Sequence, residues 1–317
     1  PASAPPRKEA VGIIGLGLMG HAIAGRLLAA GFPVVGVDVV AARNEAARRA
    51  GVTIVAEARD VLSRCRRVLL SLPTLKHVGQ LLHDHAEVLR RGQVILDTTT
   101  GSPEEAEEIH AVLAARGVEY LDATISGNSS QVASGEVTGM VGGSQRACEQ
   151  CADILQTFCR ETFHLGPCGN GSRIKLVTNL VLGLNRAALA EGLVFAERLG
   201  FTRQQALAVL IESMASSRVM HVKGRKMVEE DFVPQARLSQ HLKDVRVMRA
   251  LAKRLQLTLP FTKTHAAVLQ SAEAAGLGAL DNSAIIRAIA GLSKKATRRR
   301  APDRHARSSG KSKPFGG

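Results

Sequence analysis

The chain has 317 residues, of which 45% are hydrophobic and 22% charged, and its formal net charge is +14 at pH 7. This composition is typical of globular proteins, and the length suggests about two domains. No run of about 18 uninterrupted apolar residues occurs, which argues against a membrane-spanning segment. The cysteines, five in number, are too few for a disulfide framework, so we expect a cytoplasmic protein without membrane contacts.

The positive charge is concentrated at the C-terminal end. Residues 294–317 contain nine Lys and Arg and one Asp, so they contribute +8 and leave +6 for the rest of the chain. Their Lys, Arg, Ser, Gly and Pro content predicts a disordered tail. Basic tails attract phosphate groups, so nucleic-acid binding is left open for this segment alone. The absence of Trp and the single Tyr argue against stacking on single strands.

Residues 1–10 form an N-terminal extension, and residues 11–166 alternate short apolar runs with helix-length segments. The predicted strands are Val11–Ile14, Val34–Asp38, Val52–Val55, Arg67–Leu72, Val94–Asp97, Val118–Asp122, Val137–Val141 and Thr162–Leu165. Helices are predicted between most of them, for example at His21–Ala30, Ala41–Ala50 and Pro103–Arg116. This pattern predicts an α/β fold, a Rossmann-like doubly wound sheet with mainly parallel strands.

Residues 167–293 lose the strand pattern and predict an all-α domain that opens with a long helix. Apolar residues at helical spacing mark one stripe of this helix, namely Ile174, Val177, Val181, Leu184, Ala188, Phe195 and Leu199. Further helices are predicted at Arg203–Met214, Ser216–Glu229, Leu238–Leu255, Pro260–Ala275 and Ser283–Ala290.

Gly15, Gly17 and Gly20 form a G-x-G-x-x-G pattern, with Leu18 and Met19 inside it, directly between a predicted strand and a helical segment. The first glycine permits the tight turn, the second lets the backbone approach a pyrophosphate, and the third lets the helix pack on the strand. The amides at the helix N-terminus then face the phosphates. The pattern in this context predicts a dinucleotide-binding loop.

Asp38 ends the second predicted strand, where a carboxylate can accept hydrogen bonds from the adenosine ribose hydroxyls. A carboxylate there favours NAD, because it would repel the 2′-phosphate of NADP. Arg43 lies in the next predicted helix and could reach such a phosphate. NAD is therefore the expected cofactor, and NADP is the alternative.

Four motifs resemble the β-hydroxyacid dehydrogenase family, which includes 3-hydroxyisobutyrate dehydrogenases and tartronate semialdehyde reductases. They are the glycine loop, the segment from Asp122 to Gly127, the segment from Gly169 to Asn179, and the pair Lys243-Asp244. The resemblance covers about residues 10 to 292. It implies NAD- or NADP-dependent interconversion of a short 3-hydroxy acid and its semialdehyde. It also implies a Rossmann domain, a long interdomain helix and a helical domain. This helical domain, residues 167–293, is expected to bind substrate and to form homo-oligomers, a dimer or a tetramer.

Lys175 and Asn179 are four residues apart, so they lie on one face of the long helix. When hydride leaves a carbinol carbon the hydroxyl proton must also leave, and a lysine with a lowered pKa can take it. The resemblance implies that Lys175 is the general acid/base and that Asn179 positions the substrate.

The resemblance also implies a loop for the carboxylate of a small anionic substrate and further contacts to the nicotinamide half of the cofactor. The loop is Ser126, Gly127 and Asn128, and the cofactor contacts are Leu72, Pro73, Thr100 and Lys243. Asn128 replaces a usual glycine, and Ser129 and Ser130 follow it. These polar groups favour a more polar substrate than hydroxyisobutyrate.

Two other functions remain as alternatives, an imine reductase of the same fold and a non-catalytic binding protein whose basic tail engages nucleic acid. Relatives of both kinds usually lack the lysine, so Lys175 favours the dehydrogenase. Cys148 and Cys151 have the spacing of a zinc pair, but the other cysteines are not predicted to converge on them, so no metal site is expected.

Overall fold

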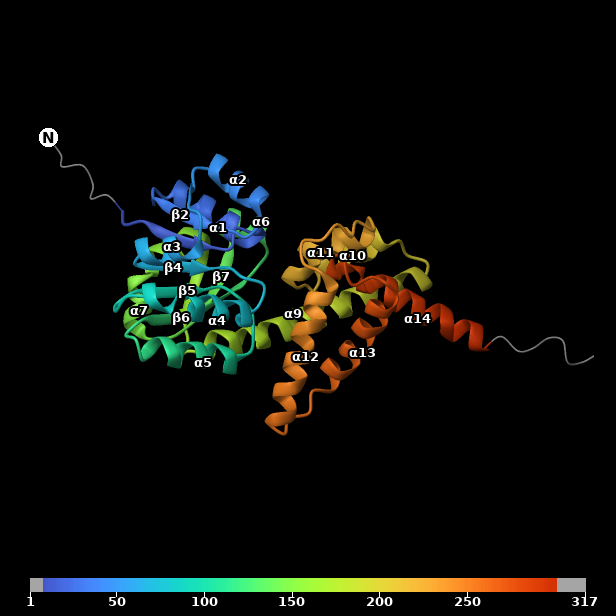
Figure 1. The fold of residues 1–317 in the computed structure, drawn as a ribbon. Coiled ribbons are helices and arrows are strands. Elements are labelled where there is room, and N and C mark those ends of the chain that lie inside the picture. Colours follow the sequence, from blue (N-terminus) through green and yellow to red (C-terminus); the bar gives the residue numbers. More distant parts are fainter. Residues whose placement is uncertain (1–7, 301–317) are drawn as a thin grey trace, which may run out of the picture. The chain divides into compact units, whose positions relative to one another are not determined.

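A computed structural model describes the backbone of residues 8–300 and the side chains of residues 8–292. Most of the predicted N-terminal extension and residues 301–317 of the predicted tail lie outside this range. The chain divides into two compact units, and the division falls within helix α9 (Asn170–Arg198; Figure 1), between Val181 and Leu182. This division is later in the chain than the boundary expected after residue 166, because the first turns of α9 pack on the sheet.

The first unit is built on one sheet of eight strands in the order β3-β2-β1-β4-β5-β6-β7-β8. The strands are β1 (Val11–Ile14), β2 (Val34–Val37), β3 (Thr53–Ile54), β4 (Arg67–Leu70), β5 (Val94–Asp97), β6 (Glu119–Ser126), β7 (Val137–Gly142) and β8 (Cys159–His164). Every neighbouring pair is parallel except β6 and β7, which are antiparallel. The predicted Rossmann-like sheet is confirmed.

Helices cover both faces of this sheet. They are α1 (Leu18–Ala29), α2 (Ala41–Arg49), α3 (Ala58–Arg64), α4 (Leu75–Asp84), α5 (Pro103–Ala114), α6 (Ser129–Ala133), α7 (Gln145–Gln150), α8 (Ala152–Phe158) and the short 3₁₀ helix η1 (Ala86–Val88). Successive strand residues point to opposite faces: Leu69 joins the core under α1 and α8, whereas Val68 and Leu70 join the core under α3, α4 and α5. Burial on both faces explains why these strands are continuously apolar.

Helix α9 exposes part of the apolar stripe that its sequence predicts. Val177, Val181, Phe195 and Leu199 are between 50% and 63% exposed. The period of 3.6 residues identifies a helix face, but it does not say whether that face packs inside the same chain. By length and composition α9 could also cross a membrane, yet core helices pass this test too, and 39% of its most apolar window is buried.

Up to residue 300, where the described backbone ends, the second unit continues from α9 with helices only, as predicted. They are α10 (Arg203–Glu212), α11 (Arg218–Val228), α12 (Leu238–Arg254), α13 (Pro260–Ala274), η2 (Asn282–Ala284) and α14 (Ile285–Arg300). Helix α14 passes residue 294, so the prediction of a disordered tail from that residue is wrong for residues 294–300. Lys and Arg are good helix formers, and no proline interrupts the helix before residue 302.

A buried ion pair anchors the second unit. The fully buried carboxylate of Asp281 accepts hydrogen bonds from Lys223 Nζ at 2.9 Å and from the backbone amides of Gln235, Ala236 and Ser283. Because Lys223 lies on α11 and Asp281 directly precedes η2, the pair joins two distant segments of the chain. Burial tends to raise the pKa of Asp281, but the bonds from Lys223 and the amides outweigh it and lower that pKa.

Candidate functional site

The glycine loop has the backbone geometry that the pattern predicts. Gly15 adopts φ +94°, which favours glycine, and a Cβ at Gly20 would lie 1.9 Å from the carbonyl oxygen of Gly15. A Cβ at Gly17 would meet nothing within 4 Å. The N-terminus of α1 therefore begins beside open space, with Leu18 exposed and Met19 partly buried. These features fit a bound pyrophosphate facing the first amides of α1.

Asp38 directly follows β2 and is held in place from several sides. Its Oδ2 accepts a hydrogen bond from Leu16 N at 2.8 Å, and its Oδ1 accepts one from Val40 N at 2.8 Å. Arg43 Nη1 lies 3.3 Å from both carboxylate oxygens. The Asn44 side chain accepts a hydrogen bond from Asp38 N and donates one to the Asp38 carbonyl, both at 2.7 Å. The carboxylate thus lies beside the glycine loop, as a ribose ligand must.

The ends of β4 and β5 bring the next group of predicted cofactor residues to the same edge of the sheet. Leu72 N donates to Thr99 Oγ1 at 3.1 Å, which ties the Leu72-Pro73 turn to the segment that contains Thr100. Thr99 N in turn donates to Asp97 Oδ1 at 2.8 Å. In parallel sheets ligands bind at the carboxyl ends of the strands, so this edge suits the nicotinamide half of the cofactor.

A buried carboxyl group supports this edge from beneath. Asp97 is 1% exposed and accepts a hydrogen bond from the hydroxyl of Tyr120 at 2.6 Å. Burial raises the pKa of Asp97 to about 7, although the hydrogen bonds from Thr99 and Tyr120 oppose that rise. Asp97 and Thr99 therefore fix the backbone on which the predicted cofactor contacts lie.

The first turn of α9 is clamped onto β6. Asp122 Oδ2 accepts a hydrogen bond from Ser172 N at 2.7 Å, and Asp122 Oδ1 accepts one from Ser172 Oγ at 2.8 Å. A Cβ at Gly171 would lie 2.2 Å from the backbone oxygen of Asp122, so only glycine permits this approach. Thr124 Oγ1 also donates to the carbonyl of Gly171 at 3.0 Å. A carboxylate at a helix N-terminus is further stabilised by the helix dipole.

Lys175 lies one turn beyond this clamp, where its side chain returns to the same strand. It is 8% exposed, and its Nζ donates a hydrogen bond to the carbonyl of Ile125 at 2.6 Å. Asn179 follows one turn later and is also 8% exposed. The two predicted catalytic residues thus share a buried face of α9 beside the end of β6.

The predicted carboxylate loop begins at that strand end. Ser126 is the last residue of β6, directly after Ile125, and Gly127 adopts φ +152° with Val137 where its Cβ would be. Asn128 caps α6, because its Oδ1 accepts a hydrogen bond from Gln131 N at 3.0 Å. Lys175, Ser126 and Gly127 are therefore gathered around the same strand end, while the carbonyl of the Asn128 side chain is engaged within the loop.

Lys243 belongs to the second unit, where it is partly exposed on α12 next to the buried Asp244. The same unit buries Arg186 and His265. Burial, together with the nearby charge of Arg186, lowers the pKa of His265 to about 4. This histidine is therefore neutral at pH 7.

The cysteines lie in the core of the first unit. All five are free and buried, and burial raises the pKa of Cys151 and of Cys168 to about 12. No group of three or more potential His, Cys, Asp or Glu ligands occurs within residues 8–292. The thiols are consistent with core positions.

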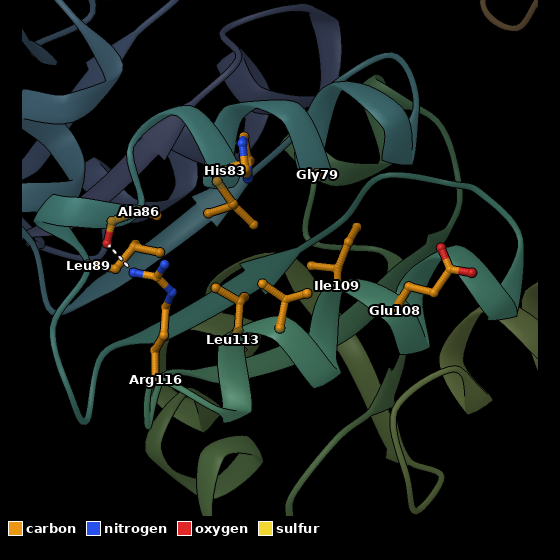
Figure 2. A pocket seen from close by; sticks show the side chains of 10 residues that line it. Gly79, His83, Ala86, Leu89, Glu108, Ile109, Leu113 and Arg116 are labelled. Atoms are coloured by element: carbon orange, nitrogen blue, oxygen red, sulfur yellow. Dashed lines mark hydrogen bonds between the residues drawn. The ribbon is translucent and has the colours of Figure 1, made fainter.

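A mostly apolar pocket of about 260 Å³ lies away from the predicted site residues, between α4 and α5 (Figure 2). Leu82, Ile109 and Leu113 contribute to its wall, and Arg116 donates to the carbonyl of Ala86 at 3.0 Å at one end. None of the predicted cofactor or substrate residues lines it. Its polar lining side chains are His83, Glu108 and Arg116.

Sequence reasoning gave no role to several residues that organise the site, among them Ile125, Asn44 and Thr99. Ile125 acts through its backbone carbonyl, which no side-chain pattern reveals. Asn44 and Thr99 organise the backbone around Asp38 and Leu72. Asn44 could have been predicted from the sequence, because it lies shortly after Asp38 and Asn side chains often form hydrogen bonds with nearby backbone groups.

Two family models match the chain. Residues 10–166 match the family model described as the NAD binding domain of 6-phosphogluconate dehydrogenase. Residues 169–289 match the model described as NAD-binding of NADP-dependent 3-hydroxyisobutyrate dehydrogenase.

Individual relatives extend the match over most of the chain. The 2-(hydroxymethyl)glutarate dehydrogenase of Eubacterium barkeri is 30% identical over 224 residues, which are 69% of this chain and 74% of that protein. The L-threonate dehydrogenase of Escherichia coli is 31% identical over 208 residues, or 65% of this chain and 69% of the relative. The crystal structure of 3-hydroxyisobutyrate dehydrogenase from Salmonella typhimurium aligns with a TM-score of 0.82 and 29% identity, covering 88% of this chain and 99% of that one. The chain therefore belongs to the β-hydroxyacid dehydrogenase family, whose members are oxidoreductases that use NAD or NADP.

Proposed function

We propose that this protein interconverts a short, polar 3-hydroxy acid and its semialdehyde, with NAD as the preferred cofactor and Lys175 as the general acid/base. The observation that carries the proposal is the position of the Lys175 ammonium, 2.6 Å from the Ile125 carbonyl and directly beside the Ser126-Gly127 strand end. A buried lysine at the start of an anion-binding loop can hold a hydroxyl or carbonyl oxygen of the substrate.

The proton step follows from this placement. In the oxidative direction the hydroxyl proton of the substrate passes to the neutral amine of Lys175, and in the reductive direction the Lys175 ammonium returns that proton to the carbonyl oxygen. The nicotinamide ring supplies the hydride acceptor or donor when the cofactor is bound. Asn179, one turn along the same helix face, is proposed to orient the reacting oxygen.

Substrate and cofactor are proposed to be held by groups on several elements. Ser126 and Gly127 offer a hydroxyl and backbone amides to the substrate carboxylate. The cofactor would be held by Gly15, Gly17, Leu18, Met19, Gly20, Asp38, Leu72, Pro73 and Thr100. Asp38 supports the preference for NAD, because its carboxylate lies beside the glycine loop.

The polar character of the loop supports a substrate with an additional hydroxyl or carboxyl group. Asn128 retains an amide NH₂ although its carbonyl caps α6, and Ser129 and Ser130 follow. Two of the relatives are named for polar acids, L-threonate and 2-(hydroxymethyl)glutarate. Tartronic semialdehyde is therefore expected to be a better substrate than methylmalonic semialdehyde.

A second copy of the chain is the proposed partner of the exposed apolar face of α9. Val177 and Val181 are four residues apart, and Phe195 follows Val181 by fourteen residues, which is two heptads. This is the spacing of apolar residues in helices that pack against one another. Burying such side chains stabilises association. Sedimentation equilibrium should give a mass above that of one 33.6 kDa chain; a monomer at micromolar concentration would contradict the dimer.

The direct test of the reaction is a cofactor-by-substrate activity matrix. NADH and NADPH are each combined with glyoxylate and with succinic, methylmalonic and tartronic semialdehydes, and the corresponding hydroxy acids are assayed with the oxidised cofactors. We expect the highest kcat/KM for NADH with a polar semialdehyde. No turnover of any of these compounds would refute the proposal, and reduction of a cyclic imine instead would identify an imine reductase.

A further inference from the structure

Arg186 is a buried cation whose side chain is not paired within the described part of the chain. It lies on α9 inside the second unit and is 1% exposed. Its Nε and Nη2 atoms are buried and have no hydrogen-bond partner among the described residues. Buried charged groups are normally paired, because removing a charge from water without a partner is costly. These two nitrogens therefore need a partner of opposite charge.

The carboxylates near Arg186 do not fill this role. Burial lowers the pKa of Arg186 to about 10, although the charges of Asp281 and Asp244 oppose this, so the guanidinium is still charged at pH 7. Both oxygens of Asp281 already accept bonds from Lys223 Nζ. Backbone amides and the Ser283 hydroxyl take up the other acceptor positions of Asp281. Neither Asp281 nor Asp244 bonds to Nε or Nη2.

Two histidine rings lie against the same side of α9. A Cβ at Gly183 would be 2.4 Å from His241 Nε2 and 2.8 Å from His265 Cε1. Arg186 follows Gly183 by three residues, so both lie on one face of the helix. Burial and the charge of Arg186 keep His265 neutral at pH 7, and its buried Nε2 has no hydrogen-bond partner among the described residues. A neutral imidazole adds no charge and can offer one N–H to an acceptor.

The two unpaired nitrogens of Arg186 favour one kind of ligand. Nε and Nη2 lie on the same edge of the planar guanidinium, and their N–H groups point in parallel. The two oxygens of a carboxylate accept such a pair of bonds in a bidentate geometry. A chloride ion or a water molecule offers a single acceptor atom and cannot reproduce it. The edge of Arg186 therefore matches a carboxylate.

We propose that Arg186, with His265 beside it, binds the carboxylate of a small organic acid within the helical second unit. Nε and Nη2 each donate one hydrogen bond to the acid, whose negative charge compensates the buried guanidinium. The carboxylate loop of the proposed function, Ser126 and Gly127, belongs to the first unit. Arg186 is thus a second carboxylate-binding residue, and this inference does not depend on the proposed reaction.

Binding of simple acids tests the assignment without turnover. Acetate, malonate and glutarate are titrated into the full chain by isothermal titration calorimetry at constant ionic strength. Acetamide serves as the neutral analogue of acetate, and chloride as an anion with one acceptor atom. We expect at least one acid to bind at least about tenfold more tightly than chloride, and acetamide not to bind. At 100 times its Kd this acid should raise the Tm by about 5 °C or more.

Variants of Arg186 separate its charge from its geometry. R186K keeps the charge but loses the two parallel N–H groups, so it should weaken the acid at least about tenfold and leave chloride within about twofold. R186M removes the charge and should abolish acid binding. R198M is the matched control, because Arg198 is exposed at the end of the same helix, and it should leave the Kd within about twofold. If R186M does not fold, R186K carries the comparison, because it retains the buried cation.

Two sources of the carboxylate give different kinetics. If the acid is a second carboxylate of the substrate, R186K should raise the KM of a dicarboxylic substrate at least about tenfold and leave that of a monocarboxylic one within about twofold. If it is a separate acid, both KM values should stay within about twofold. Either result supports the site, and the binding experiments decide it whether or not turnover is found.

Three results would overturn the inference. Equal stabilisation by acetate, acetamide and chloride would indicate a general cosolvent effect. Unchanged acid binding in R186M, or an equal loss in R198M, would place the acid elsewhere on the chain. No acid binding to the wild type would mean that Arg186 finds its counter-charge within the protein.

Discussion

Replacing Asp122 by Asn tests whether the clamp at the start of α9 sets the position of Lys175. The carboxylate accepts two bonds from Ser172, at 2.7 and 2.8 Å, and an Asn side chain can accept only one of them. A lost bond to a buried charged group costs about 1.5–3 kcal/mol. We therefore expect Asp122→Asn to lower the free energy of unfolding of the first unit by about 2 kcal/mol.

The effect on activity should be larger than the effect on cofactor binding. Lys175 lies one turn beyond Ser172, and a displacement of about 1 Å in a reacting group can lower the rate by about 100-fold. We expect kcat to fall by about 10-fold to 100-fold, while the Kd of NADH changes less than about threefold, because the glycine loop lies on β1. Denaturant unfolding, steady-state kinetics and NADH fluorescence measure the three quantities.

Glu107→Gln provides the matched control. It breaks the ion pair of Glu107 with Arg173, which joins the same turn of α9 to α5 with both side chains more than 40% exposed. Such pairs are worth about 0–1 kcal/mol, so kcat should stay within about twofold. A destabilised Asp122→Asn variant with an unchanged kcat would show that the clamp does not position Lys175.

Three further variants test other parts of the structure. Lys223→Met removes the cation from the buried carboxylate of Asp281 and should lower the free energy of unfolding by about 3–5 kcal/mol in denaturant titrations. Arg225→Met changes a residue on the same helix whose side chain is 80% exposed, and should lower it by less than about 1 kcal/mol. Equal losses in the two variants would contradict the importance of the buried pair. His265 has a pKa of about 4 when folded, against 6.5 unfolded, so the unfolded chain binds the proton first and stability is lost as the pH falls through this range. Relative to His265→Gln, the wild type should lose up to about 3 kcal/mol between pH 7 and pH 4, and a constant difference would refute the low pKa. Gly20→Ala places a Cβ 1.9 Å from a backbone oxygen of the glycine loop and should weaken NADH binding at least about 100-fold in fluorescence titration; near-normal binding would show that the loop opens easily.

The sheet was predictable because its strands are short, apolar and separated by helix-length segments. The glycine loop was predictable for a related reason, since Gly15 and Gly20 are required by local backbone geometry that a pattern can express. In both cases the signal lies in a few neighbouring residues. Long helices of the second unit carry the same kind of local signal.

The contacts that assemble the site could not be predicted in this way. Asp122 and Ser172 are 50 residues apart, and their bond depends on how α9 docks on β6. Likewise, the sequence places Asp38 and Arg43 near each other but does not say that the guanidinium turns back onto the carboxylate. Such contacts depend on side-chain direction and tertiary packing, which spacing alone does not specify.

The exposed stripe of α9 and the extent of α14 show two other limits. Val181 and Phe195 have the periodicity of a core face, yet both are at least 50% exposed. Periodicity identifies an apolar helix face but does not say what that face packs against. In α14, composition predicted disorder at residues that continue the helix to Arg300. Basic residues suit both a solvated tail and an exposed helix, so composition could not separate them.

The proton-transfer role of Lys175 is tested most directly by Lys175→Met, which keeps the length of the side chain and removes its ammonium group. General acid/base catalysis contributes about 100-fold to 10,000-fold. With the best semialdehyde from the activity matrix, we predict that kcat falls at least about 1,000-fold while the Kd of NADH stays within about threefold of the wild-type value. A variant that retains kcat within tenfold of the wild type would contradict the assignment of Lys175 as the general acid/base.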